Sequence, residues 1–298
     1  MKVIYIAGWG RSGSTLLARI LGQVQGIAHL GELRTLWTDG YKAKSRCGCG
    51  LLTRECEVWN AIMQQAFGGL EQVDLKAMVQ LRRQSEPRSQ ELFKLRFLPA
   101  QRQTFLQRSQ PYREVLAKLY QAIGQVCDAD TVVDDSLHPG YGYTLATVPG
   151  LEVYLVHLIR DVRGCTYSWT KRQKSGLGSY ELKDSSLGWD LRNLAIETLP
   201  ANANIRYHRL RYEDFVSQPQ QSVERILQFA QLEPNSLPFV TPSEVNLGIT
   251  HSIFGNDNRA STGTVTLRLD EAWKQKMARS DQLKVSLMTW PLLMKYGY

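Results

Sequence analysis

Residues 3–15 combine a short apolar run, a glycine-rich turn and a segment with helical periodicity. The run Val3–Ala7 is rich in β-formers, and a turn with three glycines follows it at residues 8–13. Apolar residues then recur at helical spacing at Leu16, Leu17, Ile20, Leu21 and Val24. A glycine turn between a buried strand and a helix presents backbone N–H groups and the positive end of the helix to an anion. The sequence therefore predicts a strand, an anion-binding loop and a helix.

This turn lacks the lysine that NTP-binding loops require. Those loops read Gly-x-x-x-x-Gly-Lys-Ser/Thr, and Ser14 stands at the lysine position here. The cation lies earlier, at Arg11, where it faces a shorter 5′ substituent than a triphosphate. A nucleotide that needs no metal ion is therefore favoured. The alternatives are a loop for ATP with magnesium and a turn that merely connects strand to helix.

Strand-like and helical segments alternate through the rest of the chain. Strand-like runs at residues 131–133 and 153–159 are each followed by polar or turn residues and a helical stretch, and a further short strand at 205–208 leads to a helix. This alternation is typical of a mostly parallel sheet with helices on both faces. We therefore predict a three-layer α/β fold, with residues 1–298 as a single domain and residues 58–127 as a helical insertion.

Two stretches depart from the alternation. In the insertion, one helical face is predicted at Val115, Leu119, Ile123 and Val126. Residues 248–264 are rich in Asn, Gly and Thr and are predicted to form a long surface loop. Helix is expected again from Asp270 to Tyr296.

The charge and the apolar runs restrict the partners. A formal net charge of +8 favours an anionic partner. The basic residues are dispersed, without a basic tail or a nucleic-acid motif, so a small anion such as a nucleotide is favoured over nucleic acid. The longest apolar runs, Val3–Ala7 and Leu151–Ile159, are much shorter than a membrane span. Since the first run stops at Gly8 and is no signal peptide, we predict a cytoplasmic protein without a transmembrane segment.

Two motifs resemble the signatures of one enzyme family. Arg-Ser-Gly-Ser-Thr-Leu-Leu at residues 11–17 resembles the 5′-phosphosulfate loop of sulfotransferases that use 3′-phosphoadenosine-5′-phosphosulfate (PAPS). Arg160, at a strand end, is followed eight residues later by Ser168, as in the second family signature. The resemblance is to the bacterial and carbohydrate sulfotransferases. It implies P-loop NTPase-like topology and metal-free transfer of a sulfuryl group from PAPS to a hydroxyl of a small-molecule, lipid or carbohydrate acceptor.

The resemblance gives roles to individual residues. The loop residues expected to bind the 5′-phosphosulfate are Gly10, Arg11, Ser12, Gly13, Ser14 and Thr15. Arg160 and Ser168 are expected to bind the 3′-phosphate, since a guanidinium can bind phosphate through two N–H groups and a hydroxyl adds a neutral donor. An ion pair of Arg160 with Asp161 or another neighbour is the alternative. Tyr212, in Tyr-Glu-Asp-Phe, resembles the tyrosine beside the adenine, and a helix-start turn with packed aromatic residues is its alternative.

Two further segments resemble the family with changes. Residues 255–259 resemble the Gly-Asn-Pro-x-Arg loop that covers the cofactor, with Asp257 and Asn258 altering its middle. The contacts expected from this loop are Gly255, Asn256 and Arg259. Residues 133–139 stand where many relatives carry Asp-Ser-Ser-Lys-x-Pro, and Leu137 replaces the lysine. Whether His138 substitutes for that lysine is open, and Asp134 also fits a magnesium-binding carboxylate of a kinase.

Sulfuryl transfer needs a base for the acceptor proton and groups that stabilise charge on the bridging oxygen. Arg11 and the loop amides can supply the second function. Glu32 is the first candidate for the base, because Gly31-Glu32 resembles the segment that carries the proposed base in bacterial relatives. Burial and a nearby phosphate would raise its pKa, whereas Arg34 or Arg11 would lower it. The alternative bases are His29, His138 and His251.

Three of the five cysteines are clustered in the sequence. Cys47, Cys49 and Cys56 are close enough to ligate a metal, but their spacing is not that of a standard zinc knuckle and the sequence shows no fourth ligand. Zinc, a redox link and a tight structural turn are the open interpretations. Cys127 and Cys165 are predicted to be buried thiols.

The acceptor and the oligomeric state are not fixed by the sequence. Two other functions remain open for the same fold. One is a small-molecule kinase that uses ATP and magnesium, and the other is a nucleotide-binding protein without catalytic activity.

Overall fold

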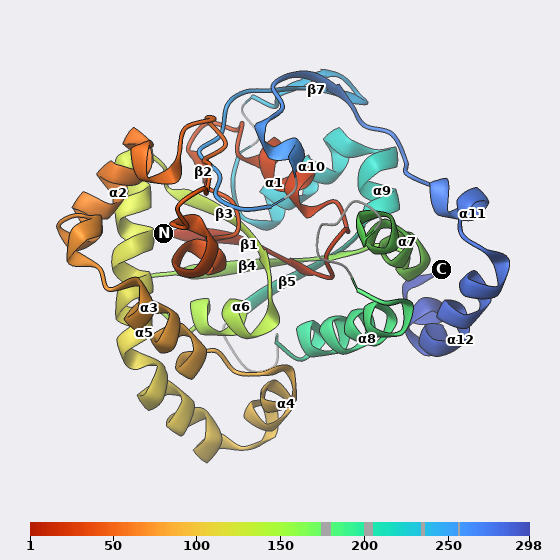
Figure 1. Cartoon of the computed structure of the whole chain (residues 1–298), viewed down its shortest axis with the longest axis horizontal. Coiled ribbons are helices and arrows are strands. Elements are labelled where there is room, and N and C mark those ends of the chain that lie inside the picture. The colour runs from red at the N-terminus through yellow and green to blue at the C-terminus, as the bar shows by residue number, and fades with distance from the viewer. Residues whose placement is uncertain (174–179, 200–204, 234–235, 256) are drawn as a thin grey trace.

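A sheet of five parallel strands, in the order β2-β3-β1-β4-β5, forms the centre of the molecule (Figure 1). The computed structural model describes residues 1–173, 180–199, 205–233, 236–255 and 257–298. The strands are β1 (Lys2–Gly8), β2 (Ile27–His29), β3 (Thr131–Leu137), β4 (Glu152–Ile159) and β5 (Ile205–Arg211). The chain leaves β1 toward β2 and leaves β4 toward β5. The adjacent strands β1 and β4 therefore mark a topological switch point, where open α/β sheets bind ligands.

Both faces of the sheet are covered, because successive residues of a strand point to opposite sides. In β1, Val3, Tyr5 and Ala7 pack into one hydrophobic core, and Ile4 and Ile6 pack into the other. Helices α2, α4, α5 and α6 close the first core, and α1, α9 and α10 close the second. The three-layer, mostly parallel α/β fold predicted from the sequence is confirmed.

Twelve α-helices are described. They are α1 (Ser14–Leu21), α2 (Glu57–Phe67), α3 (Leu75–Ser85), α4 (Ser89–Phe97), α5 (Pro99–Cys127), α6 (Pro139–Leu145), α7 (Val162–Gln173), α8 (Leu182–Thr198), α9 (Tyr212–Ser217), α10 (Pro219–Phe229), α11 (Ala272–Lys276) and α12 (Arg279–Tyr296). Among the described residues, no helix is both long and apolar enough to cross a bilayer.

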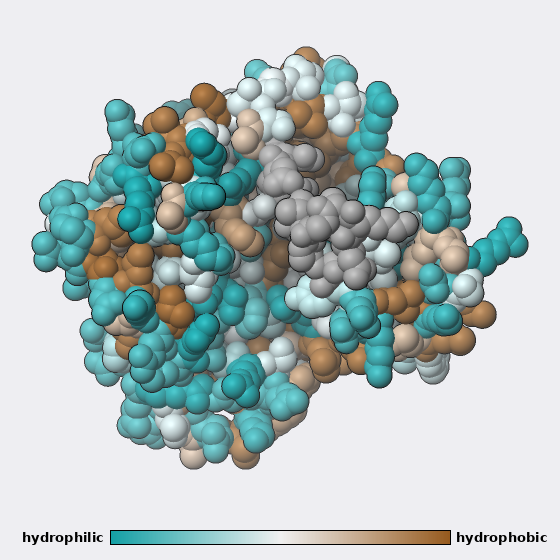
Figure 2. Space-filling view, in the orientation of Figure 1, coloured by the Kyte–Doolittle hydropathy of each residue, from teal (hydrophilic) through white to brown (hydrophobic). Residues whose placement is uncertain are grey.

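Residues 57–127 form the helices α2 to α5. In Figure 1, α2, α3 and α5 lie at the left of the sheet and α4 lies below it. The buried face of α5 includes Tyr112, Leu116, Leu119, Tyr120 and Ile123. Val115 and Val126, which were expected on this face, are only partly buried. On the face shown in Figure 2, hydrophilic side chains predominate over α3 to α5. These helices thus pack onto the sheet along one side and expose the other.

A second, antiparallel sheet, which the sequence did not predict, lies on either side of the expected loop at residues 248–264. It consists of β6 (Phe239–Thr241), β7 (Glu244–Leu247) and β8 (Gly263–Thr266), in the order β6-β7-β8. Val245 and Leu247 pack into the core that contains α1. Beyond β7 the chain returns to the main sheet, where Ile253 N–H donates to the carbonyl of Leu30 (2.8 Å). The three strands have only three or four residues each, so they show little hydrophobic alternation. The predicted loop at 248–264 was wrong at residues 263 and 264, which belong to β8.

Candidate active site

The two predicted anion-binding motifs lie side by side at the carboxyl edge of the sheet. Gly8 of β1 is opposite Leu158 of β4, so the loop after β1 and Arg160 after β4 leave the sheet at the same level. Arg160 Nη1 donates to the carbonyl oxygen of Arg11 (3.0 Å). Arg11 Nε donates to Ser168 Oγ (2.9 Å). The register of the parallel strands therefore joins motifs that are about 150 residues apart.

The loop between β1 and α1 has a strained backbone. Arg11 has φ 71° and Gly13 has φ 91°, and Gly13 is the N-cap of α1. A non-glycine residue in this region is uncommon and costs free energy. A Cβ atom on Gly13 would lie 2.7 Å from the Tyr212 ring. Glycine is thus required at position 13 for its backbone angle and for the contact with Tyr212.

Arg160 contacts an aromatic ring and a carboxylate. Its guanidinium lies over the Tyr212 ring, 4.4 Å from the centroid, and its Nη2 donates to Asp270 Oδ2 (3.0 Å). Burial alone would raise the pKa of Asp270, but the hydrogen bond and charge of Arg160 outweigh it and hold that pKa below its ordinary value. Asp161 pairs with Arg163 instead (2.6 Å). A phosphate at Arg160 would therefore have to displace the Asp270 carboxylate or share Arg160 with it.

A cavity of about 770 Å³, here called the loop cavity, opens at this edge of the sheet. The predicted site residues that line it are Gly10, Arg11, Gly13, Ser14, Thr15, Glu32, His138, Arg160, Ser168, Tyr212 and Gly255. Its described lining also holds six arginines, namely Arg11, Arg19, Arg34, Arg160, Arg192 and Arg268. Only two acidic residues, Glu32 and Asp270, are among the lining residues described. The excess of positive charge favours an anionic ligand.

Glu32 lies in the loop cavity just after β2, at the start of a short 3₁₀ turn (Leu33–Thr35). Burial raises the pKa of Glu32 to about 8, together with the negative charges of Asp135 and Asp134, whereas Arg34 opposes the rise. The causes that raise this pKa therefore outweigh those that lower it. A carboxylate with such a pKa accepts a proton readily near neutral pH.

The three histidines considered as bases occupy different places. His138 lines the loop cavity, and its pKa lies well below the ordinary value because of burial and the charge of Arg192, among other arginines. His29 is 5% exposed, its Nε2 lies 3.2 Å from Asp135 Oδ1, and it does not line the cavity. His251 packs against Cys56 outside the cavity. Glu32 and His138 are thus the candidate bases that face the loop cavity.

The sequence of residues 4–236 matches the profile that describes the sulfotransferase family. This span holds the strained loop, Glu32, Arg160, Ser168 and Tyr212. The chain belongs to the sulfotransferase family. The resemblance drawn from two motifs is thereby confirmed. A search of curated proteins finds no match.

Two solved sulfotransferase domains share the fold. One is the sulfotransferase domain from the Synechococcus PCC 7002 olefin synthase, with a TM-score of 0.55 and 18% identity over 100% of this chain and 95% of that chain. The other is the sulfotransferase domain from the curacin biosynthetic pathway, with a TM-score of 0.51 and 18% identity over 96% of each chain. At such low identity the likeness concerns the fold alone.

Ser12 and Arg259, which were predicted to contact the cofactor, do not line the loop cavity. Ser12 is fully buried, and its Oγ has no hydrogen-bond partner among the described residues. Gly255 lines the cavity, but Arg259 Nη2 donates to the carbonyl of Arg46 (2.8 Å). Asn256 lies outside the described residues. The roles of these residues stay predictions.

Arg192 of α8 is a cavity residue that sequence reasoning missed. Its Nη1 donates to the carbonyl of Leu137 (3.5 Å), and its guanidinium lies 5.5 Å from the centroid of the Trp9 ring. This sulfotransferase therefore places a cation beside the residue that stands where many relatives carry lysine. The only signal in the sequence is helical spacing, since Arg192 shares a helix face with the buried residues Trp189 and Ile196.

Both carboxylate oxygens of Asp134 accept hydrogen bonds from other groups of the sulfotransferase. Tyr120 OH donates to Oδ2 (2.5 Å), and the Ser136 N–H donates to Oδ1 (2.9 Å). Burial raises the pKa of Asp134 to about 7. Since both oxygens already accept hydrogen bonds and Asp134 does not line the loop cavity, its geometry disfavours a magnesium site of the kinase type.

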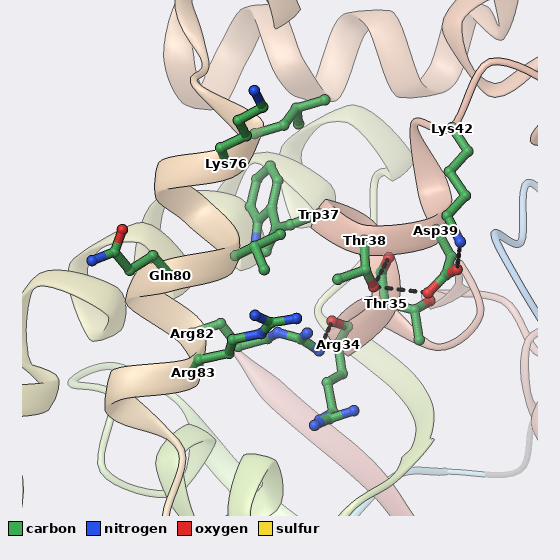
Figure 3. A pocket seen from close by; sticks show the side chains of 12 residues that line it. Arg34, Thr35, Trp37, Thr38, Asp39, Lys42, Lys76, Gln80, Arg82 and Arg83 are labelled. Carbon is green, nitrogen blue, oxygen red and sulfur yellow. Dashed lines mark hydrogen bonds and ion pairs between the residues drawn. The ribbon is translucent and has the colours of Figure 1, made fainter.

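A second cavity, of about 850 Å³ and here called the insertion cavity, shares Arg34 with the loop cavity. It lies between residues 34–42 and α3, with Trp37 beside α3 and the Lys42–Asp39 ion pair at its other end (Figure 3). Its apolar lining is Trp37, Leu75 and Val79, and its basic lining is Arg34, Lys42, Lys76, Arg82 and Arg83. The insertion cavity therefore combines apolar contacts with positive charge.

Proposed function

We propose that this sulfotransferase transfers a sulfuryl group from PAPS to a hydroxyl by in-line displacement. The observation that supports this most is that Arg11 and Arg160, from separate motifs, meet in one positively charged cavity. A nucleotide with anionic groups on its 3′ and 5′ positions matches two adjacent anion-binding motifs. In this proposal residues 10–15 bind the 5′ group, Arg160 and Ser168 bind the 3′-phosphate, and Tyr212 lies by the adenine.

Different residues at the carboxyl edge of the sheet have different roles in the transfer. Arg11 and the amides at the N-terminus of α1 stabilise the negative charge that develops on the oxygen between phosphorus and sulfur as that S–O bond breaks. Glu32 takes the proton of the acceptor hydroxyl while its oxygen forms the new S–O bond. The products are the sulfated acceptor and adenosine 3′,5′-bisphosphate. Since arginines and amides carry the charge, the proposal includes no metal ion.

We place the acceptor in the insertion cavity, which makes the helical insertion an acceptor-side cap. Arg34 lines both cavities, so an acceptor held between residues 34–42 and α3 lies next to Glu32. Arg34 and Glu86 form an ion pair (2.9 Å), whereas Lys76 and Arg83 on α3 are exposed. This lining suits an acceptor with an apolar part beside an anionic or strongly polar group. A single domain over residues 1–298 and a cytoplasmic location, both predicted from the sequence, belong to the proposal too.

Thermal unfolding tests the nucleotide directly. Adenosine 3′,5′-bisphosphate should raise the melting temperature equally with and without magnesium, because a ligand selective for the folded state stabilises it. Stabilisation by ATP that requires magnesium, with none by the bisphosphate, would instead support a kinase.

A turnover assay then separates an enzyme from a binding protein. With PAPS and a panel of hydroxyl acceptors, the sulfotransferase should release adenosine 3′,5′-bisphosphate in proportion to sulfated product. If the bisphosphate binds but no member of the panel is sulfated, a non-catalytic nucleotide-binding protein is supported.

A further inference from the structure

Cys47, Cys49, Cys56 and His251 come together in space, although 195 positions separate Cys56 from His251. One potential ligand atom from each lies within 4.8 Å of the others. His251 Nδ1 is 3.3 Å from Cys56 Sγ and 3.8 Å from Cys47 Sγ. With Zn–S and Zn–N bonds of about 2.3 and 2.0 Å, the ligand atoms of a tetrahedral zinc site lie about 3.5–3.8 Å apart. The spacing of the four side chains is thus close to that of a tetrahedral site.

The backbone around the cysteines has the shape of a metal-binding turn. Cys47 N–H donates to the carbonyl of Leu51 (2.9 Å), and Gly50 N–H donates to the carbonyl of Cys47 (2.9 Å), with Gly50 at φ 91°. Cys56 is the N-cap of α2. These backbone hydrogen bonds hold Cys47 and Cys49 in one tight turn, and the position at the helix start places Cys56 beside it.

The cluster is largely shielded from solvent. Cys47 and Cys56 are buried, with 2% and 0% exposure, and Cys49 and His251 are half-buried. Cys47, Cys49 and Cys56 are free thiols rather than members of disulfide bonds. Three sulfurs and one imidazole nitrogen are the ligands of structural zinc sites, which leave no position open for substrate. We propose that Cys47, Cys49, Cys56 and His251 form a structural zinc site.

The zinc would tie the chain after β7 to the start of the insertion. Gly48 N–H donates to the carbonyl of Ser252 (2.9 Å), and Trp59 Nε1 donates to the carbonyl of His251 (2.8 Å). A few residues later, Gly255 lines the loop cavity. Zinc at this site therefore fixes the segment that leads into the loop cavity, and it does so whether or not the nucleotide assignment is correct.

Metal analysis of the intact, tag-free chain tests this site. Protein purified without chelators should carry about one zinc per chain by mass spectrometry of its metals. Cys56→Ser and His251→Asn should each retain less than about a fifth of that zinc, while Cys127→Ser, outside the cluster, should retain it all. Wild-type protein without zinc, or variants with undiminished zinc, would overturn the proposal.

A cobalt experiment needs no variant and so covers the case in which the variants do not fold. The wild-type chain produced in cobalt-supplemented minimal medium should show the intense visible bands of tetrahedral Co²⁺ and a sulfur-to-cobalt charge-transfer band. Weak octahedral bands, or a disulfide among Cys47, Cys49 and Cys56 in protein alkylated at lysis, would contradict a Cys₃His metal site.

Discussion

The loop cavity and the insertion cavity have similar volumes, about 770 and 850 Å³, but differ in construction. The loop cavity is formed largely by residues that follow strand ends, and its Arg160 is only 6% exposed. The insertion cavity is formed by residues 34–42 and α3, where Lys76 and Arg83 are exposed. The register of the strands fixes the side chains of the loop cavity. The exposed side chains of α3 in the insertion cavity are less constrained. This contrast fits a constant nucleotide on one side and a specific acceptor on the other.

The largest effect is expected at Glu32, which lines the loop cavity two positions before Arg34, the residue that lines both cavities. Glu32→Gln removes the proton acceptor with little change in volume, so kcat should fall by about 10²–10⁴-fold. The affinity for adenosine 3′,5′-bisphosphate, measured by calorimetry, should stay unchanged. Glu57→Gln, on the exposed surface of α2, is the matched control and should keep full activity. Near-normal turnover of Glu32→Gln would transfer the role of base to His138 or another group.

The pH dependence of kcat/KM should reflect the ionisation of Glu32. Glu32 must be ionised to accept a proton, and its pKa is raised to about 8, so the ionised fraction increases as pH rises toward 8. kcat/KM should therefore rise about tenfold per pH unit below this value and level off above it. A profile that is flat between pH 6 and 8 would mean either that Glu32 is not the base or that its pKa is not raised.

Inside the loop cavity, the proposed 3′-phosphate would compete with Asp270 for Arg160. Asp270→Asn keeps the size of the side chain but removes the negative charge, so adenosine 3′,5′-bisphosphate should bind about two- to fivefold more tightly by calorimetry. Glu271→Gln, which removes an exposed neighbouring charge that pairs with Lys274, should have no such effect. Weaker binding to Asp270→Asn would mean that the carboxylate positions Arg160 for the nucleotide.

The smallest effect is expected in the insertion cavity. Lys76→Ala should lower kcat/KM by about two- to fivefold for an acceptor that carries a carboxylate. It should leave an otherwise identical neutral acceptor and the nucleotide unaffected. Lys118→Ala, on the exposed side of α5, is the control. Equal losses of kcat/KM with both acceptors would argue against an ionic contact between Lys76 and the acceptor.

The parts predictable from sequence are those where a motif directly follows a strand. Val3–Ala7 and the glycine turn predicted a strand, a loop and a helix, and the alternation of segments predicted the parallel sheet. The position of Arg160 beside the loop then follows from strand order. Short-range patterns carry this information because strands, turns and helices obey local rules.

Other contacts depend on tertiary packing and leave no local pattern. Arg192 reaches the loop cavity from the middle of α8, and Asp270 meets Arg160 across 110 positions. His251 completes the cysteine cluster from a segment that returns to the main sheet after β7. The strands of the small sheet are too short for their periodicity to separate them from loop.

In the proposed function, Arg160 binds the 3′-phosphate of a nucleotide whose 5′ group lies in the loop. Calorimetry on the wild type and on Arg160→Ala, with adenosine 3′,5′-bisphosphate and with adenosine 5′-monophosphate, tests it most directly. The wild type should prefer the bisphosphate, and Arg160→Ala should reduce that preference by about 10–100-fold while still binding the monophosphate. An equal preference in both proteins would contradict the assignment.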